Sequence, residues 1–111
     1  MKLNTLINKN KIQFDIFYRS LINKHIYNSI LGKAMKYGSM NGGKRIRPFL
    51  VREACKIVKI NNKNMMILAA CVESIHSYSL IHDDLPSMDD DDYRRGKPST
   101  HKKFDEATAI L

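Results

Sequence analysis

Residues 65–84 read MMILAACVESIHSYSLIHDD and form the strongest helical pattern in the chain. The first eight of them are all apolar, which predicts a helix that is buried on most of its sides. Pro86 follows and is expected to end or bend this helix. Such a helix has more apolar surface than the rest of a chain of this length is expected to cover.

Further helices are predicted on both sides of this stretch. Apolar residues at spacings of three and four predict one helix over residues 12–37, and Pro48 suits the first turn of another. A last helix is predicted from about Thr100. The apolar face of the first helix is expected to comprise Phe14, Phe17, Leu21, Ile22, Ile26 and Ile30. Loops are predicted over residues 38–43, 61–64 and 89–98. No strand is predicted, so the expected fold class is all-α.

The composition is that of a globular protein. Of the 111 residues, 43% are hydrophobic and 27% are charged, which indicates one ordered domain. No apolar run approaches the ~18 residues of a membrane-spanning helix, and no secretory signal is recognised, so we expect no membrane insertion. Cys55 and Cys71 lie within apolar patterns and are interpreted as buried core residues, which predicts a reducing, cytoplasmic compartment.

Charge is distributed unevenly along the sequence. Residues 1–70 carry a net charge of +12, and residues 71–111 carry −4. A basic segment suggests a nucleic-acid-binding protein as one functional class. The alternative is a solvated lysine-rich surface, because Lys, Ile and Asn make up 35 of the 111 residues, a bias that AT-rich codons can produce. The segment has no aromatic platform, and we expect no nucleic acid partner.

The first candidate site is the segment over residues 42–48, which reads GGKRIRP. Glycines ahead of a helix allow close backbone approach, and the helix N-terminus favours an anion. Lys44, Arg45 and Arg47 add positive charge, and the arginine fork matches phosphate oxygens. The segment predicts a phosphate or diphosphate site, with a basic loop before an ordinary helix as the alternative.

The second candidate is His76 on the predicted central helix. It precedes Asp83 by seven residues, or two helical turns, so the two residues share a face. A histidine at this position could donate to a phosphate. The alternative is a histidine at the rim of the core.

The third candidate is an acidic stretch that holds six aspartates within residues 83–92. Oxygen ligands without Cys or His select a hard cation such as Mg²⁺. Arg94 and Arg95 follow, so carboxylates could hold magnesium while guanidinium groups hold phosphate oxygens. On an unbroken helix Asp83 and Asp89 would lie about 120° apart, and they can share a metal only if Pro86 bends the chain or the extra residues between them bulge out.

In their combination and order, several motifs resemble those of the short-chain trans-polyprenyl diphosphate synthases, with the bacterial farnesyl diphosphate synthases nearest. The motifs are residues 42–48, Glu73-x-x-His76, residues 82–89 and residues 94–101. The resemblance covers residues 37–111 and implies an isoprenoid-synthase-type helical bundle. The family's second aspartate-rich motif has no counterpart here, so residues 1–111 are expected to be the N-terminal portion of one polyprenyl synthase domain.

The resemblance also implies a function. It implies a prenyltransferase that condenses isopentenyl diphosphate with dimethylallyl or geranyl diphosphate, uses Mg²⁺ and forms a homodimer. The expected product is farnesyl diphosphate, with geranylgeranyl or another polyprenyl diphosphate as the alternative. Residues 1–111 alone are expected to be inactive.

Individual roles are carried over onto the matching positions. The resemblance implies that Lys44, Arg47, His76 and Arg95 contact isopentenyl diphosphate, that Arg94 contacts the allylic diphosphate, that Asp83 and Asp89 bind magnesium, and that Asp84 is a supporting member of the catalytic motif. It further implies that Tyr78, five residues before Asp83, limits the length of the product. The alternative for Tyr78 is an ordinary core tyrosine.

Overall fold

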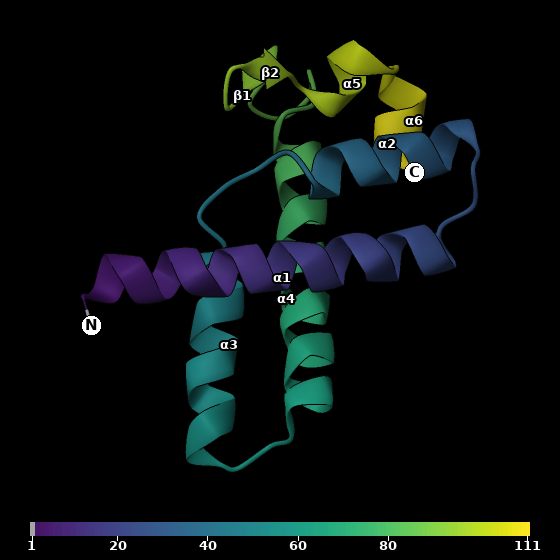
Figure 1. The fold of residues 1–111 in the computed structure, drawn as a ribbon. Helices are drawn as coiled ribbons and strands as arrows, with labels where there is room; N and C mark the ends of the chain where they lie inside the picture. Colours follow the sequence, from purple (N-terminus) through teal and green to yellow (C-terminus); the bar gives the residue numbers. More distant parts are fainter. Residues whose placement is uncertain (1) are drawn as a thin grey trace. The chain divides into compact units, whose positions relative to one another are not determined.

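The computed structural model describes residues 2–111 and confirms the all-α prediction (Figure 1). The elements are α1 (Leu3–His25), α2 (Ile30–Ser39), α3 (Ile46–Ile57), α4 (Asn62–Asp83), β1 (Tyr93–Arg94), β2 (Lys97–Pro98), α5 (Thr100–Lys103) and α6 (Glu106–Ile110). They form two compact units. The first unit comprises residues 2–22 and Lys44–Ile75, and the second comprises Asn23–Gly43 and His76–Leu111. Both α1 and α4 contribute residues to each unit.

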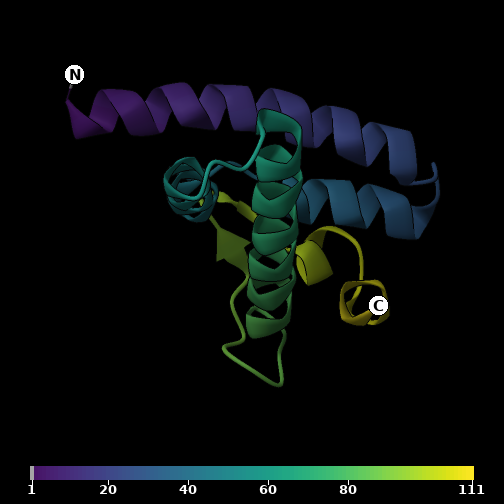
Figure 2. The same cartoon turned by 90° about the horizontal axis from the view of Figure 1, so that it is seen from below.

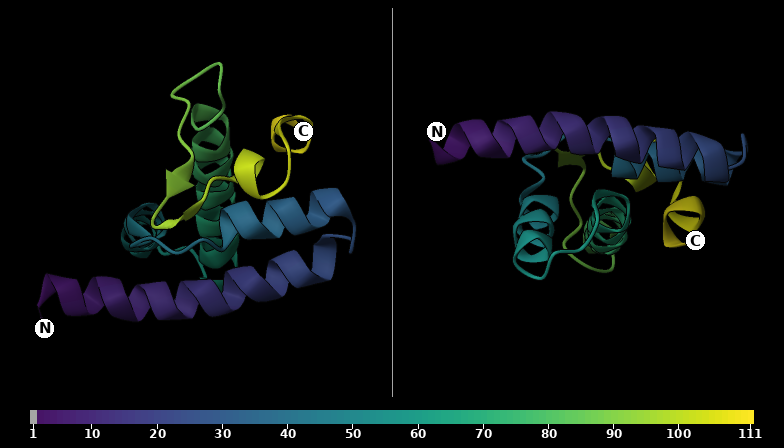
Figure 3. Two further views of the ribbon diagram at one scale, coloured as in Figure 1. Left: turned by 90° about the horizontal axis from the view of Figure 1, so that it is seen from above. Right: turned by 60° about the horizontal axis from the view of Figure 1, so that its bottom comes forward.

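In the first unit, α3 and the first half of α4 lie side by side beneath α1 (Figure 1, Figure 3). The residues of α1 that enter the core are Phe14, Tyr18 and Ile22, spaced by four, as expected for one stripe of a helix. Phe14 and Ile22 belong to the predicted face, and Tyr18 was not predicted. The other members of that face are not in the core, because Phe17, Leu21 and Ile26 are half-buried and Ile30 is exposed. The Tyr18 hydroxyl lies 2.8 Å from the Ser74 hydroxyl, so its polar end has a partner inside the unit.

The prediction of one helix over residues 12–37 is wrong, because the chain breaks between His25 and Ile30. Ser29 is the N-cap of α2, and its hydroxyl accepts a hydrogen bond from the Gly32 amide at 3.0 Å. Gly32 packs against the backbone of Tyr27, where a Cβ would come within 1.9 Å of the carbonyl oxygen. Serine at an N-cap was the available signal for this break.

In the second unit, α5 and α6 pack against α2 (Figure 2, Figure 3). The Tyr37 ring meets the Phe104 ring edge-on at 5.8 Å, and the Tyr37 hydroxyl donates to the Pro98 carbonyl. The predicted last helix is divided into α5 and α6, because Asp105 caps a new helix by accepting from the Thr108 amide at 2.8 Å. The hydrogen bonds that Asp105 accepts from the Thr108 amide and hydroxyl lower the pKa of its carboxyl.

The predicted loop over residues 89–98 contains a small antiparallel hairpin that was not predicted. Tyr93 pairs with Pro98, and Arg94 pairs with Lys97. Arg95 and Gly96 at the tip have φ angles of 52° and 75°, both in the left-handed region that a tight two-residue hairpin requires. A sequence of two arginines before a glycine is an uncommon signal for such a turn, since one arginine must adopt a positive φ.

The long helix α4 contains most of the predicted stretch but begins at Asn62, so the predicted loop over residues 61–64 is wrong, and the helix is not buried on most of its sides. Ile67, Leu68, Val72, Ile75 and Tyr78 are exposed large side chains, so the expectation of uncovered apolar surface is confirmed. By length and composition this helix could cross a membrane, and 28% of its most apolar 18-residue segment is buried. Core helices of globular proteins have the same length and composition.

The two cysteines are free thiols with different surroundings. Cys55 is buried in α3 as predicted, whereas Cys71 is exposed. The interpretation of Cys71 as a core residue is therefore wrong. Cys71 lies on the side of α4 that carries Ile67, Leu68 and Val72, which are also exposed.

Candidate functional site

The glycine-rich loop before α3 has an unusual backbone. Gly42 and Gly43 have φ angles of 88° and 98°, and Arg45 has a φ of 56° directly before the helix begins at Ile46. A non-glycine residue in this region costs roughly 1–2 kcal/mol, so other contacts must stabilise it. Lys44 precedes Arg45 and Arg47 follows it by two residues, and both of these side chains are exposed. An exposed lysine and arginine beside a helix N-terminus form a suitable place for a phosphate group.

The surroundings of Arg45 differ from those of the two exposed cations, Lys44 in the loop and Arg47 in the first turn of α3. The Arg45 guanidinium is buried, and its Nε donates to Asp15 Oδ1 at 2.8 Å while its Nη1 donates to Glu73 Oε1 at 2.9 Å. The sequence pattern groups Arg45 with Lys44 and Arg47 as cations of the predicted phosphate site and indicates no partner for Arg45. The available signal was the scarcity of acidic residues, since Asp15 is one of two among the first 70 residues.

In the second unit, the acidic stretch reverses the chain after α4. The helix ends at Asp83, and the Asp89 amide donates to the Asp83 carbonyl at 2.8 Å. A second bond, from the Asp90 amide to the Leu85 carbonyl at 3.0 Å, closes the turn. The helix is therefore interrupted between Asp83 and Asp89, as the predicted metal site requires. The backbones of Asp83 and Asp89 lie together, although six residues separate them.

Asp84 has a different environment from Asp83 and Asp89. It is 2% exposed, and its two carboxylate oxygens accept from Arg94, Oδ2 from Nε at 2.8 Å and Oδ1 from Nη2 at 2.7 Å. The hydrogen bonds to Asp84 raise the pKa of Arg94, with the charges of Asp84, Asp91 and Asp83 adding to the effect and burial opposing it. Arg94 is therefore fixed as a cation beside the acidic turn.

The donor set of the acidic turn fits a magnesium ion. Among residues 2–111, no three His, Cys, Asp or Glu side chains converge as a complete metal site. Magnesium does not require such a cage, because it keeps several waters and is bound through one or two carboxylates together with substrate phosphates. Asp83 is half-buried and Asp89 is exposed at the turn, which leaves both carboxylates suited to that partial role.

Arg95 packs against the glycine-rich loop within the second unit. A Cβ placed on Gly43 would come 2.8 Å from Arg95 Nη2, so the guanidinium lies directly on the Gly43 backbone. Gly43 thus meets two demands, a positive φ and the absence of a side chain. This contact joins the start of the first predicted motif to the paired arginines of the third.

The remaining predicted residues lie on the second half of α4. His76 is half-buried, and its carbonyl accepts from the Ser79 hydroxyl at 2.7 Å. Tyr78 is 59% exposed, so it does not belong to the core that residues 2–111 form. The centroid of its ring lies 4.4 Å from that of the His82 ring. His82 Nε2 in turn lies 3.0 Å from the Ile110 carbonyl oxygen.

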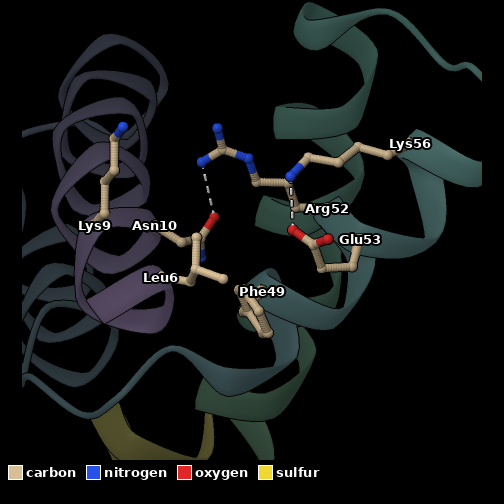
Figure 4. Close-up of a pocket in the computed structure, with 7 residues that line it drawn as sticks. All are labelled: Leu6, Lys9, Asn10, Phe49, Arg52, Glu53 and Lys56. Carbon is tan, nitrogen blue, oxygen red and sulfur yellow. Dashed lines mark hydrogen bonds and ion pairs between the residues drawn. The ribbon is translucent and has the colours of Figure 1, made fainter. Parts of the chain in front are cut away.

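A pocket of about 140 Å³ lies in the first unit and contains none of the predicted site residues (Figure 4). Two of its three cations are engaged by neighbouring residues. Arg52 donates to Asn10 at 3.1 Å, and Lys56 pairs with Glu53 at 2.7 Å. The seven lining residues are Leu6, Lys9, Asn10, Phe49, Arg52, Glu53 and Lys56. The candidate residues of the sequence motifs therefore lie outside this pocket.

The sequence model of the polyprenyl synthetase family matches residues 28–111, and the chain belongs to this family. This assignment replaces the nucleic-acid-binding alternative.

Individual relatives share large parts of the sequence. Over 85 residues the chain is 54% identical to farnesyl diphosphate synthase of Haemophilus influenzae, covering 77% of this chain and 29% of that protein. It is 52% identical over 82 residues to a chloroplastic geranylgeranyl pyrophosphate synthase of Capsicum annuum, covering 74% of this chain and 22% of that protein. The crystal structure of a geranyltransferase from Legionella pneumophila superposes with a TM-score of 0.90 at 47% identity, covering 96% of this chain and 38% of that one. The chain thus spans less than two fifths of these relatives.

Proposed function

We propose that this chain belongs to a Mg²⁺-dependent prenyltransferase that condenses isopentenyl diphosphate with an allylic diphosphate. The observation that carries the proposal is the acidic turn, where the Asp89 amide bonds the Asp83 carbonyl and Asp84 holds Arg94. This arrangement supports the proposal, because carboxylates that suit a hard cation lie near a guanidinium that suits phosphate oxygens. Family membership supports the same reading. Because the chain spans less than two fifths of its relatives, we propose that activity requires the remaining part of the domain.

Each side chain has a proposed role in binding and charge neutralisation. Asp83 and Asp89 would hold magnesium, which when bound neutralises the departing diphosphate. Arg94 holds the oxygens of the allylic diphosphate, and Asp84 orients Arg94. Lys44, Arg47, His76 and Arg95 bind isopentenyl diphosphate. No protein nucleophile is needed, since the allylic diphosphate ionises to an allylic cation and pyrophosphate, the double bond of isopentenyl diphosphate attacks that cation, and the adduct then loses a proton. The contribution of these residues is electrostatic stabilisation of the leaving group.

The proposed product is farnesyl diphosphate. Support comes from the farnesyl diphosphate synthases of Haemophilus influenzae and Micrococcus luteus, which are 54% and 47% identical to the matched residues. Geranylgeranyl diphosphate remains the second candidate, because a geranylgeranyl synthase is 52% identical. The residue proposed to decide between them is Tyr78. Its exposed ring on the second half of α4 is available to limit a cavity formed with the rest of the domain.

We further propose a homodimer and a cytoplasmic location. The exposed apolar residues of α4, Leu68 and Val72 among them, are available to pack against helices of the remaining domain or of a second subunit. The free thiols of Cys55 and Cys71 suit a reducing compartment.

The test is pyrophosphate release by the purified full-length protein supplied with isopentenyl and geranyl diphosphates. We expect release that depends on both substrates and stops when EDTA removes Mg²⁺. Release from geranyl diphosphate alone would indicate hydrolysis, and release unaffected by EDTA would contradict the metal proposal.

A further inference from the structure

The three cations at the junction of the glycine-rich loop and α3 have unequal surroundings. Lys44 and Arg47 are exposed, whereas Arg45 between them is 4% exposed. Burial of a guanidinium is unfavourable unless it is paired, and Arg45 has two carboxylate partners, Asp15 and Glu73. A residue held in this way cannot reach out to a substrate phosphate without breaking both ion pairs.

The surroundings of Arg45 fix its orientation from several sides. Its guanidinium carbon lies 5.5 Å from the ring centroids of both Phe14 and Tyr18. Asp15 is itself held by Lys11, whose Nζ donates to Oδ2 at 2.8 Å. These contacts come from α1 and α4, so two helices of the first unit hold one residue of the loop.

The backbone of Arg45 links this anchor to its neighbours. It adopts the left-handed conformation with φ 56° and ψ 44°, and its carbonyl accepts the Phe49 amide at 3.2 Å as the first bond of α3. The direction in which Lys44 leaves the loop and the position of Arg47 on α3 both depend on this conformation. Because an arginine does not favour a positive φ, the buried ion pairs stabilise it.

We propose that Arg45 is a positioning residue, which through Asp15 and Glu73 holds the left-handed turn that presents Lys44 and Arg47 to isopentenyl diphosphate. The inference rests on the proposed function, in which those two cations bind that substrate. It also gives Glu73, a member of the Glu-x-x-His motif, a defined task as the buried acceptor for Arg45.

The experiment compares three variants of the full-length protein by steady-state kinetics with each substrate varied in turn. Arg45→Lys keeps the charge but cannot span both carboxylates, and Glu73→Gln keeps the shape but removes one charge. The matched control is Arg52→Lys, which alters another arginine of α3 that bonds α1, at Asn10 and Gln13. Thermal unfolding of each variant reports its stability.

We expect Arg45→Lys and Glu73→Gln to raise the KM for isopentenyl diphosphate about tenfold, with a change of less than about twofold for the allylic substrate. Arg52→Lys should leave the ratio of the two KM values unchanged even where it lowers stability. If Arg45→Lys does not fold, the ratio of the two KM values in Glu73→Gln tests the inference instead. Equal increases in both KM values, or the same ratio change in Arg52→Lys, would overturn the inference. A wild-type protein without prenyltransferase activity would instead refute the proposed function.

Discussion

Arg94 donates two hydrogen bonds to the buried carboxylate of Asp84, from Nε at 2.8 Å and from Nη2 at 2.7 Å. The bidentate pair joins β1 to the residue that follows α4. It gives adjacent aspartates different tasks, because Asp84 is engaged by an arginine while Asp83 lies at the end of the helix beside the turn. The proposed metal ligands are therefore Asp83 and Asp89, with Asp84 orienting Arg94.

Asp84→Asn should weaken binding of the allylic diphosphate through Arg94. The amide retains one acceptor oxygen, but its NH₂ group opposes a guanidinium N–H. A hydrogen bond between charged groups contributes roughly 1.5–3 kcal/mol, so the KM for geranyl diphosphate should rise about tenfold or more. Asp92→Asn is the control, since that carboxylate is exposed and lies 3.5 Å from Lys102. Equal KM values in the two variants would remove the positioning role of Asp84.

Lys44→Ala and Arg47→Ala should each weaken isopentenyl diphosphate more than the allylic substrate. Each removes one charge-assisted contact, worth roughly 1.5–3 kcal/mol. Arg47→Lys should also raise the KM, because a point charge cannot reproduce the bidentate fork. Steady-state kinetics with each substrate varied would show the difference. Equal weakening of both substrates would count against a dedicated site for isopentenyl diphosphate.

Gly43→Ala should impair isopentenyl diphosphate binding more than Gly42→Ala does. Both positions have a positive φ, 88° at Gly42 and 98° at Gly43, so both variants carry a similar backbone penalty. A Cβ at Gly43 would displace the Arg95 guanidinium, whereas a Cβ at Gly42 meets nothing within 4 Å. The ratio of the two KM values for isopentenyl diphosphate isolates the contact with Arg95. A ratio near one would mean that this contact is unimportant for binding.

Tyr78→Ala should lengthen the product from fifteen carbons to twenty or more. Tyr78 lies five residues before Asp83, which is about 7.5 Å along the helix, in the direction in which a growing chain would leave the diphosphates. Chromatography of the dephosphorylated products measures the chain length. Tyr27→Ala provides a control, since it removes another exposed tyrosine that lies outside α4. An unchanged product from an active Tyr78→Ala variant would reject the role of this ring.

The sequence was sufficient to predict the features that depend on local patterns. The apolar run after Met65 predicted α4, and the spacing of Asp83 and Asp89 on a helix required the bend that the Asp89 amide closes. The breaks at Ser29 and Asp105 were missed, although both residues are N-caps. A cap of this kind depends on one side-chain hydrogen bond. The apolar periodicity over residues 12–37 continues past Ser29 and therefore does not indicate the break.

The ion pairs of the site could not be predicted, because they join residues that are distant in sequence. Arg45 meets Asp15 and Glu73 across 30 and 28 positions, and no local spacing indicates that pairing. Exposure of Cys71 was missed for a related reason. An apolar helix pattern predicts which side chains prefer burial, but whether they are buried depends on what covers that face.

The turnover of Asp83→Ala in the full-length protein tests the central claim most directly, because the proposal assigns magnesium and the leaving diphosphate to this carboxylate. The prediction is a kcat lower by about 10²–10³-fold, with a much smaller change in the KM for isopentenyl diphosphate. Asp92→Asn should keep wild-type turnover. A kcat for Asp83→Ala close to that of the wild type at saturating Mg²⁺ would contradict the assignment of the metal to the acidic turn.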